Sequence, residues 1–146
     1  MVLRVVSGVR TGENTEDLRS FLSHLDGSPE VHETALLACG NHGDERPTWT
    51  YVEADAAAGV ARRRCLQCAT NVWALDSEER WTFPHMWSCK SCGQSIAEVA
   101  AGLSMPDGDK VEWLVLGARC VDCGRIDGLT DLVLPGTPLS EVMGRL

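Results

Sequence analysis

The sequence lacks long apolar runs and is poor in aromatic residues. Only 5% of its 146 residues are aromatic, with two Phe and one Tyr. No apolar run approaches the about 18 residues that a membrane span requires. Segment 1–6 is also too short, and too abruptly followed by polar residues, for a secretory signal. We therefore expect a soluble, cytoplasmic protein with no membrane partner.

Positive charge is scarce as well. The chain carries 13 Lys and Arg against 21 Asp and Glu, which gives a formal net charge of −8. Bare nucleic acid is bound chiefly by neutralising its phosphates with Lys and Arg, so an acidic chain is a poor candidate for that role. The composition instead favours a basic protein surface, or an intact protein or ribonucleoprotein assembly, as the partner.

Hydrophobic and charged residues are present in the proportions of a folded protein. They make up 44% and 23% of the chain, which excludes the low-hydrophobicity, high-charge composition of disordered proteins. The length suits one domain of ordinary size or two small ones. The unusual feature of the composition is its seven cysteines.

Six cysteines form C-x-x-C pairs, and the seventh begins a C-x-x-H pair. The four half-sites are Cys65/Cys68, Cys89/Cys92, Cys120/Cys123 and Cys39/His42. Eight such ligands are the number needed to close two tetrahedral zinc sites. Catalytic zinc keeps an open coordination position, whereas these ligands would leave none, so the ligand set favours structural zinc.

The half-sites at 89–93 and 120–124 resemble the knuckles of the zinc-ribbon (rubredoxin-like) superfamily. The resemblance covers roughly residues 36–134 and implies short β-hairpins that carry two knuckles around each metal. Backbone amides beyond the second ligand favour a left-handed residue there, usually Gly. Gly43, Gly93 and Gly124 occupy this position in three half-sites. The departures from the superfamily pattern are Ala69 in the fourth, His42 in place of a cysteine, and the lack in every knuckle of the proline that is common after the first cysteine.

The half-sites can share two ions in three ways. Sequential pairing gives one site of Cys39, His42, Cys65 and Cys68 and another of Cys89, Cys92, Cys120 and Cys123. A repeat of knuckle, hairpin, knuckle and apolar strand in the two halves favours this pairing. The gap between Cys68 and Cys89 fits the usual spacing of about 15–20 residues and favours joining those two pairs instead. A cross-braced arrangement is the third alternative.

The ligand types also indicate which metal is bound and which histidine is the eighth ligand. We expect two Zn²⁺ ions, with iron as the alternative at the four-cysteine site, because tetrahedral sulfur ligation suits either metal. His32 or His85 could replace His42 as the eighth ligand. Disulfides would need an oxidising compartment, which the expected location does not provide.

The apolar pattern predicts a small α+β protein that is mostly β. A short β-α element is expected at 1–33, a first zinc ribbon at 34–80, and a second ribbon with a C-terminal tail at 81–146. Leu18, Phe21, Leu22 and Leu25 follow helical spacing, and Asn14 or Thr15 can cap that helix. Thr137 and Pro138 can begin a short final helix. Strands are expected near 1–6, 49–54, 60–64, 72–75, 96–103, 111–116 and 129–134.

Two further features could contact a partner. Strand alternation puts Arg62 and Arg64 on one side of a hairpin and Arg63 on the other. These cations either line a solvated strand edge or contact phosphate or an acidic peptide. Trp81, Phe83 and Trp87 lie between the expected ribbons. They either pack the repeats together or provide a protein hot spot or a stacking platform for a base.

The sequence contains no nucleotide-binding loop, no nucleophile elbow and no zinc-deaminase signature, and it suggests no small-molecule substrate. We predict a non-enzymatic zinc-binding adapter or regulatory protein that docks onto a larger assembly. Transcription or translation machinery is the analogy that zinc-ribbon proteins offer. One alternative is direct nucleic-acid binding through Arg62–Arg64 and the nearby aromatics. Another is a rubredoxin-like iron electron carrier or an enzyme of unrecognised type.

Overall fold

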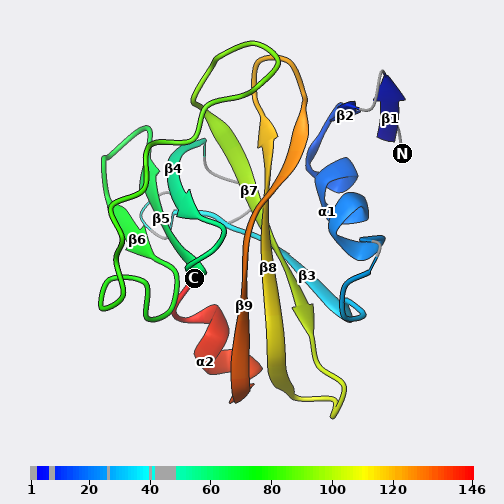
Figure 1. Cartoon of the computed structure of the whole chain (residues 1–146), viewed down its shortest axis with the longest axis vertical. Helices are drawn as coiled ribbons and strands as arrows, with labels where there is room; N and C mark the ends of the chain where they lie inside the picture. The colour runs from blue at the N-terminus through cyan, green and yellow to red at the C-terminus, as the bar shows by residue number, and fades with distance from the viewer. Residues whose placement is uncertain (1–2, 7–8, 26, 40, 42–48) are drawn as a thin grey trace.

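A computed structural model describes residues 3–6, 9–25, 27–39, 41 and 49–146 (Figure 1). Its two helices and an antiparallel sheet confirm the predicted small, mostly β architecture. No helix among the described residues is long and apolar enough to cross a membrane. In chain order, the elements are β1 (Leu3–Val6), β2 (Val9–Gly12), α1 (Thr15–Ser23), β3 (Glu33–Leu36), β4 (Thr50–Asp55), β5 (Val60–Cys65), β6 (Asn71–Trp73), β7 (Ala97–Ser104), β8 (Lys110–Cys120), β9 (Ile126–Pro138) and α2 (Leu139–Met143).

The sheet is built from two three-stranded meanders. Its strands follow the order β6-β5-β4-β7-β8-β9, with β3 also pairing along β7, while β1 and β2 form a separate hairpin. The order is symmetric about the junction of β4 and β7, where Thr50 pairs with Ala97. The hairpins assigned to two tandem ribbons are therefore halves of one sheet, so the tandem ribbons are not confirmed. The domain limits at residues 33 and 80 stay predictions.

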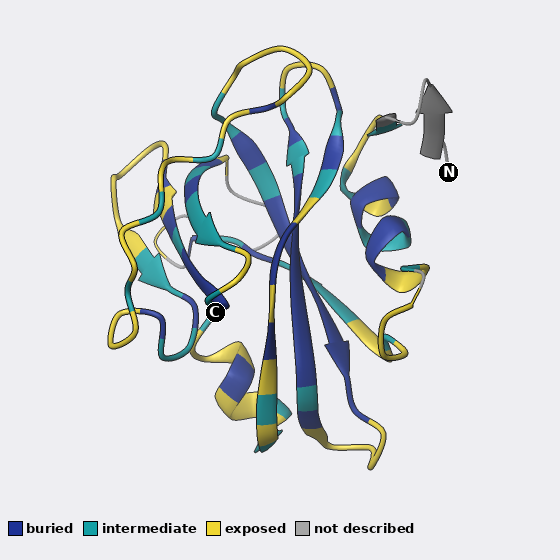
Figure 2. Ribbon diagram, viewed as in Figure 1, coloured by how far each residue is buried: buried dark blue, intermediate teal, exposed yellow. Residues whose placement is uncertain are grey.

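The two faces of the sheet carry separate hydrophobic clusters. Figure 2 colours the buried residues of the helices and strands dark blue. Helix α1 packs against β7 and β8 on one face, where Leu18 and Leu22 are fully buried. A Cβ on Gly117 would lie 2.9 Å from Leu22 Cδ2, so this glycine permits the close approach of the helix. The larger cluster lies on the other face and includes Leu37, Val52 of β4 and Val142 of α2. This second face also carries the buried cysteines at the ends of β5 and β8.

The local predictions correspond well to the observed elements. Asn14 caps α1 by accepting the backbone N–H of Asp17 at 3.1 Å, and α2 begins directly after Pro138. The sequence analysis missed β2 and β3, each of four residues. Strand β3 forms by pairing with the far half of β7. That pairing joins segments distant in sequence, so local periodicity gives no sign of it.

Candidate metal centres

The three C-x-x-C pairs fold into the same knuckle turn. The residue after the second cysteine donates its backbone N–H to the carbonyl of the first cysteine. These bonds measure 2.9 Å from Ala69, 2.8 Å from Gly93 and 2.9 Å from Gly124. The first cysteine in turn donates its N–H to the carbonyl five residues later, with N···O distances of 3.0, 2.7 and 2.8 Å at Cys65, Cys89 and Cys120. Each turn thereby aims two sulfurs to the same side.

The residue after each pair is left-handed, as the sequence analysis predicts. Its φ angle is 61° at Ala69, 80° at Gly93 and 81° at Gly124. Glycine adopts this conformation freely, whereas an L-residue pays about 1–2 kcal/mol for it. Ala69 is therefore the strained member of the three.

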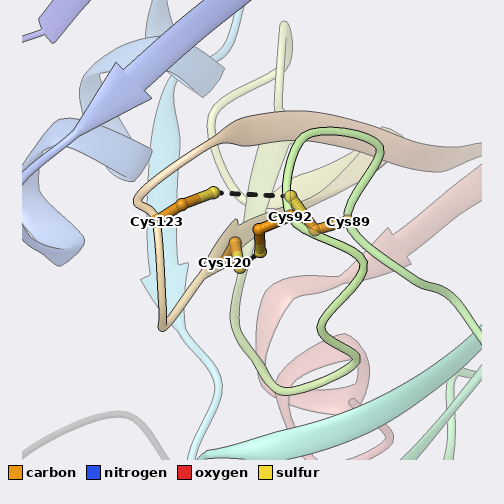
Figure 3. Close-up of side chains that lie close together, drawn as sticks. All are labelled: Cys89, Cys92, Cys120 and Cys123. Carbon is orange, nitrogen blue, oxygen red and sulfur yellow. Dashed lines mark hydrogen bonds between the residues drawn. The ribbon is translucent and has the colours of Figure 1, made fainter.

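The centre that we call the second centre consists of Cys89, Cys92, Cys120 and Cys123 (Figure 3). Its four sulfurs lie within 4.8 Å of one another, with 3.5 Å between Cys89 and Cys123 and between Cys92 and Cys120. Four sulfurs at a Zn–S distance of about 2.3 Å on a tetrahedron would be separated by about 3.8 Å. The donor set therefore fits a tetrahedral ion of zinc or iron size.

Burial and backbone amides set the electrostatics of the second centre. Burial raises the pKa of the Cys123 thiol to about 12, and its hydrogen bonds with the neighbouring cysteines act in the same direction. Burial also raises the pKa of Cys89, but the backbone N–H groups of Cys92 and Ser91 outweigh it and leave that pKa below its usual value. Such N–H donors stabilise thiolates and orient them as ligands.

The first centre consists of Cys39, Cys65 and Cys68, whose sulfurs also lie within 4.8 Å of one another. The sulfurs of Cys39 and Cys68 are 3.7 Å apart. Thr70 Oγ1 lies 3.1 Å from the sulfur of Cys68 and accepts a hydrogen bond of 3.0 Å from Asn41 Nδ2. The two groups of cysteines are those of the sequential pairing.

The eighth ligand is not settled by these groups. His42 lies outside the described residues, so its role stays a prediction. Neither centre includes a histidine among the described residues. Nδ1 of His32, one alternative ligand, accepts the backbone N–H of Met105 at 2.9 Å.

Arg63 of β5 adjoins the first centre. It is only 7% exposed and lies two residues before Cys65 on the inward face of the sheet. Burial lowers the pKa of its guanidinium to about 10, whereas Cys39 and Cys65 act in the opposite direction.

The two centres occupy one end of the same face. Cys65 pairs with Thr50, Thr50 with Ala97, and Ala97 with Cys120, which forms one row across four strands. Residues directly opposite each other share a face. Three inter-strand steps of about 4.8 Å place the Cα atoms of Cys65 and Cys120 about 14 Å apart. A single sheet therefore positions the first cysteine of both knuckles.

The three consecutive arginines have different environments. Arg62 pairs with Glu53 and lies over the rings of Trp73 and Trp81, at 4.7 and 5.0 Å from their centroids. Arg63 is buried. Arg64 is exposed and donates from Nε to Asn71 Oδ1 at 3.2 Å. Strand alternation predicts that Arg62 and Arg64 share a side of the hairpin, but Arg62 lies against Trp73 and Trp81, so Arg64 is the exposed arginine of the three.

The candidate aromatic contacts also separate. Trp81 packs edge to face on Trp73, with ring centroids 4.8 Å apart. Trp87 packs against the larger core cluster, and its backbone N–H donates to the Val52 carbonyl at 2.7 Å. Phe83 is 83% exposed and has a left-handed φ of 56°. Among the three, Phe83 is the side chain that a partner could cover.

Arg119 is a supporting residue that the sequence analysis missed. It donates to the carbonyls of Gly12 at 2.7 Å and Glu13 at 2.8 Å, and to Glu98 Oε1 at 2.7 Å. The N–H of Gly12 also bonds to the Gly124 carbonyl at 2.8 Å. These contacts tie the second centre to β2 at the far end of the chain. The available signal was an arginine directly before the cysteine in both Arg64-Cys65 and Arg119-Cys120.

No protein-family model, curated protein or solved structure matches this chain. The resemblance to zinc-ribbon knuckles is therefore supported by the two cysteine clusters, which are compatible with it.

Proposed function

We propose that the protein is a non-enzymatic adapter that holds two structural metal ions and docks onto a larger assembly through protein contacts. Zinc is the favoured metal, and iron is the alternative. The observation that carries the metal assignment is the grouping of four sulfurs in the second centre within 4.8 Å. Bound zinc supplies folding free energy there and no redox chemistry. Cys89, Cys92, Cys120 and Cys123 would hold one ion, and Cys39, Cys65 and Cys68 would supply thiolates to the other.

The docking part of the proposal is supported by the surface around Phe83. This side chain precedes Pro84, and a residue before proline is normally extended rather than left-handed. A bulky residue held at positive φ and left in solvent is costly and is typical of functional positions. Met86, next along the same segment, is 47% exposed and bridges to Glu53 of β4. The exposed carboxylates of Glu78 and Glu79 nearby in sequence suit a basic partner surface.

The metal content is tested by native mass spectrometry of protein purified without chelator. Two zinc ions per chain are expected. The variants Cys120→Ser and Cys65→Ser should each lose one ion, because each removes a buried thiolate from a different centre. Metal-free wild-type protein would overturn the proposal.

The docking is tested by affinity purification from the native host, with and without nuclease. Phe83→Ser should lose the bound partner, whereas Val133→Ser should retain it. Val133 is the matched control because it is 84% exposed and lies on β9, away from the Phe83 segment in sequence. Loss of the partner after nuclease treatment would instead favour the nucleic-acid alternative.

A further inference from the structure

We propose that Arg63 compensates the charge of the first centre and makes that centre selective for a divalent ion over a trivalent one. This inference rests on the proposed metal binding and deepens it. It concerns a residue of the chain itself, on the inward face of β5, and not the ligands that the cysteine pattern predicts.

Arg63 occupies a position in which a cation is unusual. Its cross-strand neighbours are Val52 on β4 and Val72 on β6, so apolar residues flank it on both sides. Ala61 and Cys65, two residues to either side on the same strand face, are buried as well. Within the described part of the chain, no ion pair joins its guanidinium to a carboxylate.

An arginine cannot relieve this burial by losing its proton near neutral pH. A buried charge without a counter-charge is strongly destabilising, and a partner of opposite sign must offset it. Cys65 lies two residues along the same buried face of β5, and the sulfurs of Cys39 and Cys68 lie within 4.8 Å of its sulfur. The arrangement therefore suits a centre that carries net negative charge in the folded protein.

The formal charges balance for one class of ion. Three thiolates contribute −3 and a divalent ion +2, which leaves −1 for the centre and matches the single charge of Arg63. A neutral fourth ligand, such as imidazole or water, does not change this balance. A trivalent ion would bring the centre to zero and leave the buried guanidinium without compensation. Arg63 therefore favours Zn²⁺ or another divalent ion in the first centre.

The second centre provides the contrast. The residue two positions before Cys120 is Ala118, which is fully buried on the same face. The four thiolates of that centre have no buried cation at this position. The cations near the second centre, Arg119 and Arg125, are each paired with a carboxylate, that of Glu98 at 2.7 Å and that of Asp127 at 2.8 Å. Among the described residues, a buried cation without a carboxylate partner is therefore found beside the first centre and not beside the second.

The test compares Arg63→Met and Arg63→Lys with the wild-type protein, using Arg64→Met as the matched control on the neighbouring, exposed position. Zinc affinity is measured by competition with a chromophoric chelator. Amide hydrogen exchange around Cys65 and Cys120 shows from which centre each zinc ion is released. Arg63→Met should weaken zinc at the first centre by about 10–100-fold. Arg63→Lys should keep the affinity within a few-fold, as should Arg64→Met. The second centre should not change in any of these variants.

A second readout separates charge from packing. In the iron-loaded protein, a nearby positive charge favours Fe²⁺ over Fe³⁺. Arg63→Met should therefore lower the reduction potential of one of the two centres by about 60 mV, which corresponds to a tenfold change for one electron. Arg63→Lys should restore that potential, and a residue that only fills space would not produce this pattern.

The outcomes distinguish the two proposals. Wild-type protein without metal would overturn the proposed function. Wild-type protein with two zinc ions, and an Arg63→Met variant with unchanged first-centre affinity and potential, would overturn the role of Arg63 alone. If Arg63→Met does not fold, Arg63→Lys decides: retained affinity supports charge compensation, and loss of affinity in a folded Lys variant overturns it.

Discussion

The two halves of the sheet place the same knuckle turn in different surroundings. In the half formed by β7, β8 and β9, Gly124 is buried and bonds through its carbonyl to Gly12. In the half formed by β4, β5 and β6, the equivalent Ala69 is exposed and left-handed. The same local turn is therefore stabilised by tertiary contacts in one half of the sheet and depends more on its metal ligands in the other half.

The residues directly before the two knuckles also differ in their environments. Arg119 has a side-chain exposure of 12% and binds three groups from β2, the segment after it and β7. Arg64, at the matching position before Cys65, is exposed. Two residues before the first cysteine, the charged residue is the buried one in the other half. Arg63 is charged and buried there, whereas Ala118 at the matching position is a small apolar residue. Repetition of the backbone turn therefore does not extend to the side chains that support it.

The largest effect is expected on metal removal. Structural zinc supplies about 10 kcal/mol or more of apparent binding free energy in small zinc domains. We expect the first centre to release its ion before the second, because the second has four thiolates, two left-handed glycines and the bonds to β2. A chelator titration followed by amide hydrogen exchange should show loss of protection around Cys65 before Cys120. Simultaneous loss, or earlier loss around Cys120, would contradict this order.

A pair of glycine variants tests the tertiary contact at the second centre. Gly124→Ala would place a Cβ 2.6 Å from the Gly12 carbonyl oxygen at a φ of 81°. Gly93→Ala has nearly the same φ, 80°, but no atom within 4 Å. We expect a loss of about 3 kcal/mol for Gly124→Ala and about 1 kcal/mol for Gly93→Ala. Urea unfolding at fixed zinc concentration measures both, and equal losses would show that the contact with Gly12 is unimportant.

Arg119 and Arg64, at matching positions before a knuckle, test the side-chain contacts that connect the second centre to β2. Arg119→Gln removes the partner of Glu98, whose side chain is 13% exposed, and two hydrogen bonds to backbone carbonyls. We expect a loss of about 3 kcal/mol in unfolding free energy. Arg64→Gln should change it by less than about 0.5 kcal/mol, as is usual at exposed positions. Similar values for the two variants would remove the proposed difference between the halves.

The smallest effect is expected at Ala69. Ala69→Gly relieves about 1–2 kcal/mol of left-handed strain but loses about 0.4–1 kcal/mol through the greater entropy of the unfolded chain. The net result is a stabilisation of about 0.5 kcal/mol, visible as a small rise in the urea midpoint. Gly93 provides the reference for a relaxed turn. A destabilised Ala69→Gly variant would show that the turn is not strained in the zinc-loaded protein.

Local chemistry made much of the structure predictable. The C-x-x-C spacing and the following glycine require a tight left-handed turn, so the knuckles follow from six or seven consecutive residues. Helix α1 follows from the spacing of Leu18, Phe21 and Leu22, together with its cap. Alternation and turn residues indicate β4, β5, β7, β8 and β9, although β8 and β9 extend several residues beyond their predicted limits and β2 and β3 were not predicted. Each of the predicted features depends on neighbours in the chain, which is why the sequence alone determined them.

Tertiary structure decided how those pieces combine. The sequence did not reveal that β4 and β7 join two hairpins into one sheet, because a single pair, Thr50 and Ala97, makes that junction. It did not reveal the bonds of Arg119 to Gly12 and Glu13, which connect residues more than 100 positions apart. The burial of Arg63 also depends on strands on both sides of it. Such contacts arise from the packing of distant segments, so no local pattern of residues could have specified them.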